Sequence, residues 1–326
     1  MAEVTAAPTT RKTQTVLGTG SAPGKIIVLG EHAVVYGQPA LAAALDRGVR
    51  VVVEKDEEGP RLRAPRWGVV APLSGEEGSA PLSVALERVR AAVAPELTQV
   101  ALVAEDRLPL GAGLGSSAAL TVASARALAA AAGRELTVDR LTEVVHAAEQ
   151  VFHGNPSGVD QATVVRGGVI QFQRSPGGTP SIRPVNAARP IPVVVALERP
   201  HVGTKEAVEG LRRRRDRHPR TLDLLLGELG ALCTEGTAAV EKGDLVTLGE
   251  LMDLAHGILS ALGVSSSDLD GLVQFARSQG ALGAKLTGAG VGGAMIALTD
   301  GDPDRARQLV LAFRARGASA FACELG

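Results

Sequence analysis

The sequence lacks the features that mark several large classes of protein. It has only two cysteines, Cys233 and Cys323, in 326 residues, which is too few for a disulfide framework and typical of a reducing compartment. Aromatic residues make up only 2%, so the core has to be built from Ala, Val and Leu. The formal net charge of −1 lacks the basic excess of a nucleic-acid-binding protein. No run reaches the ~18 apolar residues that a membrane helix requires, so we expect neither nucleic acid nor a membrane as a partner.

The N-terminal segment and the middle of the chain suggest how it is organised. Residues 1–19 are rich in Thr and Pro and lack the apolar core of a signal peptide, so we expect a flexible tail on a cytoplasmic protein. The chain is long for a single core, and its Pro/Gly-rich stretch at 175–192 is the best candidate for a linker. We therefore expect two domains, at 20–190 and 191–326. Strands and helices alternate without a strict βαβ rhythm, which predicts an α+β fold in both.

Local patterns predict the main elements. Runs rich in β-branched residues predict strands at residues 24–29, 50–54, 99–104, 167–172, 191–197 and 295–299. Apolar periodicity and end signals predict helices at residues 116–132, between Thr137 and Gly154, and at 205–215, 221–241, 245–261, 267–279 and 303–316.

The segment LPLGAGLGSSAAL (108–120) places three glycines at alternate positions directly before a predicted helix. It lacks the lysine of a Walker loop and the third glycine of a dinucleotide-binding loop. A glycine-rich turn that enters a helix exposes backbone N–H groups at the positive end of the helix dipole, which favours an anion. A tight turn before a buried helix would leave the same pattern, and both interpretations stay open.

Three ionisable residues are candidates for chemistry in the next segments. Lys25 begins a predicted strand in SAPGKIIVLGEHAVVYG (21–37), where burial is costly unless the lysine is paired; the alternative is an edge-strand lysine that reaches solvent. Glu149 lies between His146 and His153 on one helical face, but this spacing is not that of a zinc site and is more typical of a solvated surface. Asp160 follows an Asn-Pro-Ser-Gly turn, where it is either a poised acid or a turn residue.

A second glycine-rich segment, KLTGAGVGGAMIAL (285–298), satisfies the pattern G-x-G-x-x-G through Gly288, Gly290 and Gly293. The residues that follow are typical of a strand, whereas a dinucleotide-binding unit requires a helix there. We therefore do not interpret it as a dinucleotide site. A glycine-rich turn between two extended segments can still contact a ligand through its backbone.

Taken in this order, the four segments resemble the motifs of the GHMP small-molecule kinases. The first motif is present as APGKIIVLGEHAVVYG, the second as LPLGAGLGSSAAL and the third as KLTGAGVGGAMIAL, with EQVFHGNPSGVDQA and HVGTKEAV between them. The resemblance spans roughly residues 20 to 298. It is greatest to members that phosphorylate mevalonate, because galactokinases carry arginine at the position of Lys25 and phosphomevalonate kinases tend to have tyrosine at that of His32.

The resemblance implies two α+β domains with the active site in the cleft between them, and transfer of a phosphoryl group from ATP to the C5 hydroxyl of mevalonate. It implies a loop around the ATP phosphates formed by Gly111, Ala112, Gly113, Leu114, Gly115, Ser116 and Ser117. Ser117 and Glu149 would hold Mg²⁺. Asp160 would accept the hydroxyl proton, with Lys25 beside it. The substrate would also contact Glu31, His32, Thr204, Gly288 and Ala289.

Several points stay open at this level. Val291 and Ala294 interrupt the four glycines with which the third motif normally continues, and we expect Val291 to stiffen the loop or to narrow its approach to the substrate. The sequence does not identify the cation that receives the carboxylate of mevalonate, and it leaves a homodimer open. The alternatives are a kinase of the same family acting on phosphomevalonate or homoserine, and a non-catalytic ligand-binding relative.

Overall fold

The computed structural model describes residues 15–76, 78–106, 108–109, 111–153, 157–175, 177–198 and 204–326. The strands in these ranges are β1 (Val16–Leu29), β2 (Pro39–Lys55), β3 (Arg61–Ala64), β4 (Val69–Pro72), β5 (Val100–Asp106), β6 (Val169–Gln173), β7 (Ser181–Val185), β8 (Ile191–Glu198), β9 (Gly283–Thr287), β10 (Gly293–Leu298) and β11 (Ser319–Leu325). The helices are α1 (Pro81–Val93), α2 (Ser116–Ala131), α3 (Val138–His153), α4 (Val159–Arg166), α5 (Thr204–Arg217), α6 (Pro219–Lys242), α7 (Leu245–Ala261), α8 (Ser267–Ser278) and α9 (Pro303–Ala315), with 3₁₀ turns at η1 (Ala33–Tyr36) and η2 (Pro65–Trp67).

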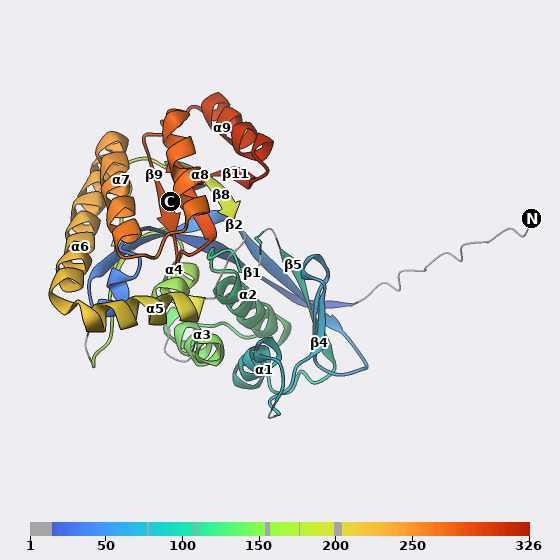
Figure 1. Ribbon diagram of the computed structural model, residues 1–326. Helices are drawn as coiled ribbons and strands as arrows, with labels where there is room; N and C mark the ends of the chain where they lie inside the picture. The colour runs from blue at the N-terminus through green and yellow to red at the C-terminus, as the bar shows by residue number, and fades with distance from the viewer. Residues whose placement is uncertain are drawn as a thin grey trace, which may run out of the picture.

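One mixed sheet runs through both halves of the chain. Its main order is β4-β3-β5-β2-β11-β8-β10-β9, and β2 also pairs with β1 and with β6. The long strand β2 has several partners in the first half of the chain: its residues 39–43 pair with β6 and its residues 49–55 pair with β5. The last strand, β11, joins the halves through the pair Leu325–Leu45. In Figure 1, helices α1 to α4 lie below the blue β1–β2 hairpin, α7 to α9 lie above it, and α6 runs along the left side of the molecule.

Helix α2 packs unusually close to β1 because glycines face it. A Cβ atom on Gly18 would lie 2.4 Å from the backbone nitrogen of Ala131, and one on Gly20 would lie 2.4 Å from the carbonyl oxygen of Ala123. The facing residues of α2 are mostly alanines and are buried. The absence of bulky side chains at this contact lets α2 lie directly on β1.

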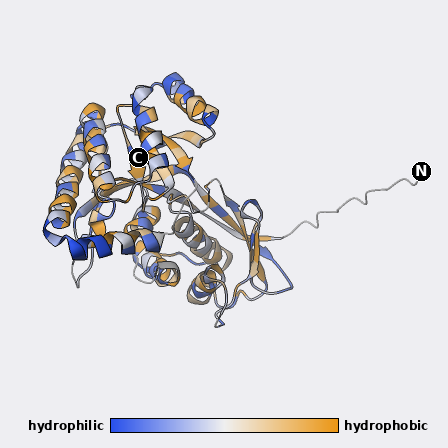
Figure 2. Ribbon diagram, in the orientation of Figure 1, coloured by the Kyte–Doolittle hydropathy of each residue, from blue (hydrophilic) through white to orange (hydrophobic). Residues whose placement is uncertain are grey.

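In the second half of the chain, α7 also packs closely on β9 because glycines meet at the contact. A Cβ atom on Gly283 would lie 2.1 Å from the carbonyl oxygen of Gly249. Asp244 caps α7 by accepting a hydrogen bond from the backbone N–H of Thr247. Figure 2 shows one end of α5 as strongly hydrophilic, whereas α6 and α7 alternate hydrophobic and hydrophilic residues along their length.

The mixed α/β architecture and the elements predicted from sequence patterns are confirmed, with longer strands than the patterns indicated. Sequence patterns missed α1, α4, β3, β4, β7, β9 and β11. The expected linker at 175–192 contains a strand, β7, which pairs with β6 and is therefore not a free connection. The boundary between residues 190 and 191 stays a prediction. Within the described ranges, no helix is both long and apolar enough to cross a membrane.

The close contact between α2 and β1 makes a testable prediction. Replacing Gly20 with Ala would force the new methyl group into the α2 backbone, and overpacking of this kind costs about 1–3 kcal/mol. Urea unfolding should show that loss. The matched control is Gly227→Ala, because Gly227 lies within α6 with open space where a Cβ would be. The control should be up to ~1 kcal/mol more stable than the wild type, since Ala favours a helix. Equal stability of the two variants would contradict the packing argument.

Candidate active site

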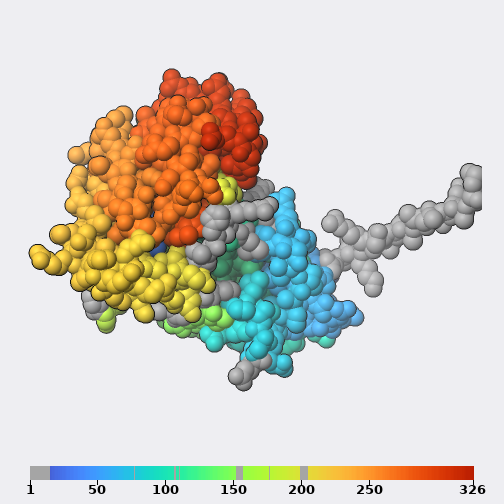
Figure 3. All heavy atoms as spheres, in the orientation of Figure 1, coloured from blue at the N-terminus to red at the C-terminus, as the bar shows by residue number. Residues whose placement is uncertain are grey.

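A cavity of about 600 Å³ lies between the two halves of the chain. Figure 3 shows the molecule hollowed between α5, in yellow, and the blue and cyan segments of the first half. The predicted site residues that line it are Lys25, His32, Gly111, Gly113, Gly115, Ser116, Ser117, Glu149, Asp160, Gly288 and Ala289. The structure therefore brings together residues from all four sequence motifs.

The alternating glycines of the second motif form one wall of the cavity. Gly111, Gly113 and Gly115 have φ angles of 71°, 76° and 72°, which only glycine adopts readily. Between them, Ala112 and Leu114 turn away from the cavity into the hydrophobic core. The alternation thus separates a face that lies open to a ligand from a face that anchors the loop, and the N-terminus of α2 follows at the cavity wall.

Lys25 is buried under this loop. Its Nζ atom lies 2.9 Å from Oδ1 of Asp160 and donates a hydrogen bond of 3.0 Å to the carbonyl of Gly113. A Cβ atom on Gly115 would lie 2.7 Å from Cγ of Lys25, so the loop closes directly over the lysine stem. The alternative of a lysine that reaches solvent from an edge strand is wrong, since Lys25 is only 2% exposed.

Asp160 belongs to the first turn of α4 and is not simply a turn residue. The chain enters α4 through Gly158, which has a φ angle of 91° and lies against the ring of Phe172. The Asp160 side chain is 39% exposed and contacts Lys25 at the cavity wall. It is thus the solvent-accessible member of the ion pair.

Glu149 faces inward from α3, so the expected solvated surface is wrong for this residue. It is 3% exposed, and it interacts with the hydroxyl of Ser117. Burial and the nearby Asp160 raise the pKa of Glu149 to about 8, although Lys25 and Ser117 act in the opposite direction. On the same face, His146 hydrogen-bonds the side chain of Gln161, while the His153 side chain lies outside the described residues.

His32, in the first motif, contacts the third motif at the cavity wall. Its Nε2 atom lies 2.9 Å from the carbonyl oxygen of Ala289. A carbonyl only accepts, so Nε2 carries the proton and Nδ1 is left as an acceptor. Burial lowers the pKa of His32, and Lys285 lowers it further. The imidazole is therefore neutral near pH 7. The backbone of His32 has a φ angle of 58°.

Glu31 does not reach the cavity. It is fully buried and forms an ion pair with Lys285, which is also fully buried. Burial raises the pKa of Glu31, and Lys285 opposes that rise. Thr204 begins α5, but its side chain lies outside the described residues.

Other residues at the site were not predicted from the sequence. Lys205 and Glu209 of α5 line the cavity, and the apolar part of its wall includes Val34, Val35, Trp67 and Leu82. The Trp67 indole N–H donates to the carbonyl of Leu108, which anchors it beside the second motif. No sequence pattern singles these residues out, whereas Lys285 could have been noticed as a charged residue in an apolar strand.

The cavity combines a glycine-rich loop at a helix N-terminus, where anions are favoured, with an ion pair and a buried carboxylate. The chain belongs to the GHMP kinase family. The family's model described as GHMP kinases N terminal domain matches residues 82–168, and GHMP kinases C terminal matches residues 237–319.

Individual relatives narrow the comparison. The chain is 38% identical to the mevalonate kinase of Aeropyrum pernix over 315 residues, covering 94% of this chain and 96% of that protein. It is 34% identical to the mevalonate kinase of Thermococcus sibiricus over 318 residues, covering 91% and 92%. The crystal structure of L. major mevalonate kinase in complex with R-mevalonate has a TM-score of 0.83 and 25% identity, covering 97% of both chains. The two-domain fold with a cleft between the domains is confirmed.

The buried position of Glu149 predicts a pH-dependent stability. Between about pH 4.5 and 8 the folded protein keeps a proton on Glu149 that the unfolded chain has released, so the free energy of unfolding falls as the pH rises through this window. Glu149→Gln removes this dependence. In EDTA, its stability relative to the wild type should increase between pH 5 and pH 8, as measured by urea unfolding.

The control for this measurement is Glu135→Gln, which changes an exposed glutamate in the loop before α3. Its stability relative to the wild type should be the same at both pH values. A constant difference between Glu149→Gln and the wild type would show that Glu149 has the same pKa in the folded and unfolded states.

Proposed function

We propose that the protein phosphorylates the C5 hydroxyl of mevalonate with ATP, giving ADP and 5-phosphomevalonate. The observation that carries this proposal is the Lys25–Asp160 pair, which faces the glycine loop and the start of α2 in one cavity. Similarity to mevalonate kinases along nearly the whole chain supports the choice of substrate. Phosphomevalonate and homoserine as substrates, or ligand binding without catalysis, are not favoured by these relatives.

In this proposal the ATP phosphates lie against residues 111–117. The three glycines expose backbone N–H groups on the cavity side, and the α2 dipole adds partial positive charge at Ser116. Ala112 and Leu114 would support the loop from the core. The loop could therefore bind the ATP phosphates in more than one geometry. It would not need the lysine that a Walker loop carries.

The oxygen donors at the cavity fit Mg²⁺. Mg²⁺ prefers one or two carboxylates together with phosphate oxygens and water, and Glu149 lies beside Asp160 and the Ser117 hydroxyl. Burial and, second to it, the nearby Asp160 raise the pKa of Glu149, so a divalent cation would stabilise a buried carboxylate and relieve its repulsion by Asp160. We propose Glu149 and Ser117 as its ligands. When bound, the ion would neutralise charge on the phosphates.

Asp160 and Lys25 would act on the hydroxyl group. We propose that Asp160 orients the C5 hydroxyl and accepts its proton, since it is the exposed member of the pair. Lys25, held by Asp160 and the Gly113 carbonyl, would then face the transferred phosphoryl group. Phosphoryl transfer through a loose transition state requires little deprotonation of the nucleophile until late, so orientation and charge stabilisation would dominate.

The remaining polar groups would bind the rest of the substrate. His32 offers Nδ1 as a hydrogen-bond acceptor, and Gly288 and Ala289 offer backbone groups at the cavity wall. Thr204, at the start of α5, stays a proposed contact. Glu31 would act through its neighbours, because it does not line the cavity.

Lys205 is our candidate for the cation that receives the substrate carboxylate. It lines the cavity from the first turn of α5, and among the described residues no ion pair includes it. Lys25, the other lysine of the cavity lining, is engaged by Asp160. Glu209 lines the cavity one turn further along α5 and would repel a carboxylate, which confines the anion to the first turn.

The test of the proposed function is a coupled ADP-release assay with ATP and Mg²⁺, in which mevalonate, phosphomevalonate, homoserine and galactose are compared. Mevalonate alone should be turned over. Asp160→Ala should lower kcat at least ~10²-fold, since a positioned acid–base group contributes at least that much. The control Asp139→Asn removes an exposed carboxylate of α3 and should keep wild-type kcat. Near-normal turnover by Asp160→Ala would refute the role of Asp160.

Lys205→Met tests the carboxylate contact. We expect KM for mevalonate to rise ~10-fold or more, because a charge-assisted hydrogen bond is lost, while KM for ATP stays the same. Steady-state kinetics with each substrate varied separately measures both values. Lys205→Arg should recover part of the affinity, and Arg213→Met, which removes an exposed charge from the same helix, should change neither value. A rise in KM for ATP instead would assign Lys205 to the nucleotide.

A further inference from the structure

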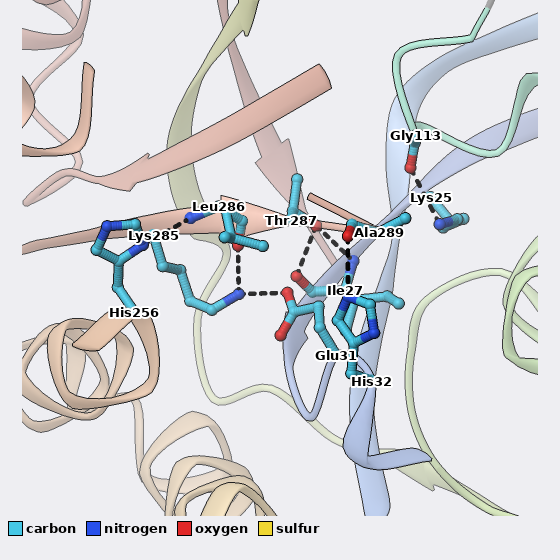
Figure 4. A network of polar contacts seen from close by, with 10 residues as sticks. All are labelled: Lys25, Ile27, Glu31, His32, Gly113, His256, Lys285, Leu286, Thr287 and Ala289. Atoms are coloured by element: carbon cyan, nitrogen blue, oxygen red, sulfur yellow. Dashed lines mark hydrogen bonds and ion pairs between the residues drawn. The ribbon is translucent and has the colours of Figure 1, made fainter. Parts of the chain in front are cut away.

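One face of β9, together with the loop after it, contacts the first motif through every second residue. Lys285 pairs with Glu31, the hydroxyl of Thr287 donates to the carbonyl of Ile27 at 2.9 Å and accepts from its N–H at 3.2 Å, and the carbonyl of Ala289 meets His32 at 2.9 Å. Figure 4 shows these three contacts in a row across the junction of the two halves. We call them the β9 contact row.

The ion pair of this row is an inefficient way to stabilise a fold. Glu31 and Lys285 are both 0% exposed. Removing two charges from water costs several kcal/mol per ion, and an apolar pair of similar volume is often as stable or more so. Within the described residues, the Oε2 atom of Glu31 has no hydrogen-bond partner, so the pair is not fully compensated. What such a pair supplies is a fixed geometry between two segments that are 254 residues apart.

The segment that this geometry holds is strained. His32 has a φ angle of 58°, a conformation that costs a residue with a side chain about 1–3 kcal/mol unless its surroundings maintain it. Gly30, two residues earlier, has no room for a side chain, since a Cβ would lie 2.4 Å from the carbonyl oxygen of Pro39. The Glu31 side chain is anchored by Lys285, and the His32 ring by Ala289. The contact row therefore holds the strained segment at two successive side chains.

The loop that follows β9 is fixed at both ends. Lys285 also donates a hydrogen bond of 2.6 Å to the carbonyl of Leu286, which orients its ammonium group toward Glu31. Beyond Ala289, the N–H of Val291 donates to the carbonyl of Val264 at 2.8 Å. Gly288 and Ala289, between these anchors, line the cavity together with His32. A shift in the β9 contact row would therefore move both His32 and the Gly288–Ala289 backbone at the cavity wall.

We propose that Lys285 and Glu31 are positioning residues, which through the β9 contact row place His32 and the Gly288–Ala289 backbone for binding of the phosphoryl acceptor. The inference rests on the proposed function for the identity of that acceptor, mevalonate. Neither residue touches the substrate. The nucleotide loop touches this wall where Gly288 faces Gly113, but it is held by its own contacts to Lys25 and to the core, so the row acts on affinity for the acceptor and not on affinity for ATP.

The double variant Glu31→Met with Lys285→Met separates positioning from stability. Each single change leaves one buried charge without its partner and should lower Tm clearly. The double variant removes both charges and should recover most of that loss. If the pair positions the site, KM for mevalonate in the double variant stays raised ~10-fold or more and kcat falls, while KM for ATP is unchanged, because small displacements at a site reduce its efficiency strongly.

Thr287→Val gives a second, uncharged test of the same row. Valine keeps the shape of threonine and suits a strand, but it removes both side-chain hydrogen bonds to Ile27. We expect KM for mevalonate to rise about threefold or more, at constant KM for ATP, in a folded protein. This variant decides the question if the double methionine variant does not fold. The control is the exposed pair Arg183–Glu241, whose double methionine variant should show wild-type kinetics.

Wild-type KM and kcat for mevalonate in the folded Glu31/Lys285 double variant would overturn the proposal, since the pair would then serve the fold alone. A parallel rise of KM for ATP in Thr287→Val would also overturn it. Failure of the proposed function is distinct from either result: the wild-type protein itself would then not turn over mevalonate.

Discussion

The ion pair between Lys25 and Asp160 is the interaction on which the rest of the site depends. A lysine buried this deeply requires a partner, and the chain supplies two, a carboxylate from α4 and the carbonyl of Gly113. The second partner is available only because the loop 111–115 passes directly over the lysine, and Gly115 makes that approach possible. Helix α2, which packs on glycines of β1, begins at the wall of the same cavity that Lys25 lines. A single buried cation thus ties together a strand, a loop and two helix N-termini.

The charges of the cavity would suit the proposed metal–nucleotide complex. Burial raises the pKa of Glu149, the nearby carboxylate of Asp160 raises it further, and Lys25 only partly offsets these effects. Without a ligand, the protein relieves the excess of negative charge by holding a proton on Glu149 near neutral pH. A divalent cation beside Glu149 would take over that task. The glycine loop adjoins this pair of carboxylates, since its Ser117 hydroxyl interacts with Glu149, so in the proposed function the phosphates and the metal ion would bind at neighbouring parts of the cavity.

The sequence identified those parts of the fold and site that depend on local rules. The alternating glycines at 111–115, the helix that starts at Ser116 and the strand that carries Lys25 all follow from neighbouring residues. The inward orientation of Glu149 did not, because the spacing of α3 cannot show that α4 covers that face. The pair between Glu31 and Lys285 spans 254 residues, and no local pattern specifies such a partner. Short strands such as β7 and β11 were missed because they are defined by their pairing with β6 and β8.

Val291 shows how the protein accommodates a departure from its family pattern. It has a φ angle of 55°, which is rare for a β-branched residue and is the conformation that a glycine at this position would adopt freely. The strain is maintained by the hydrogen bond to Val264, and a side chain at neighbouring Gly290 would collide with the same carbonyl at 1.9 Å. The loop therefore keeps the backbone conformation that a glycine would adopt, but Val291 has less conformational freedom than a glycine. Together with the β9 contact row, this anchors the side of the cavity formed by His32, Gly288 and Ala289 in both halves of the chain. In the proposed function these residues bind the acceptor, and selectivity for one small alcohol would require such a fixed wall.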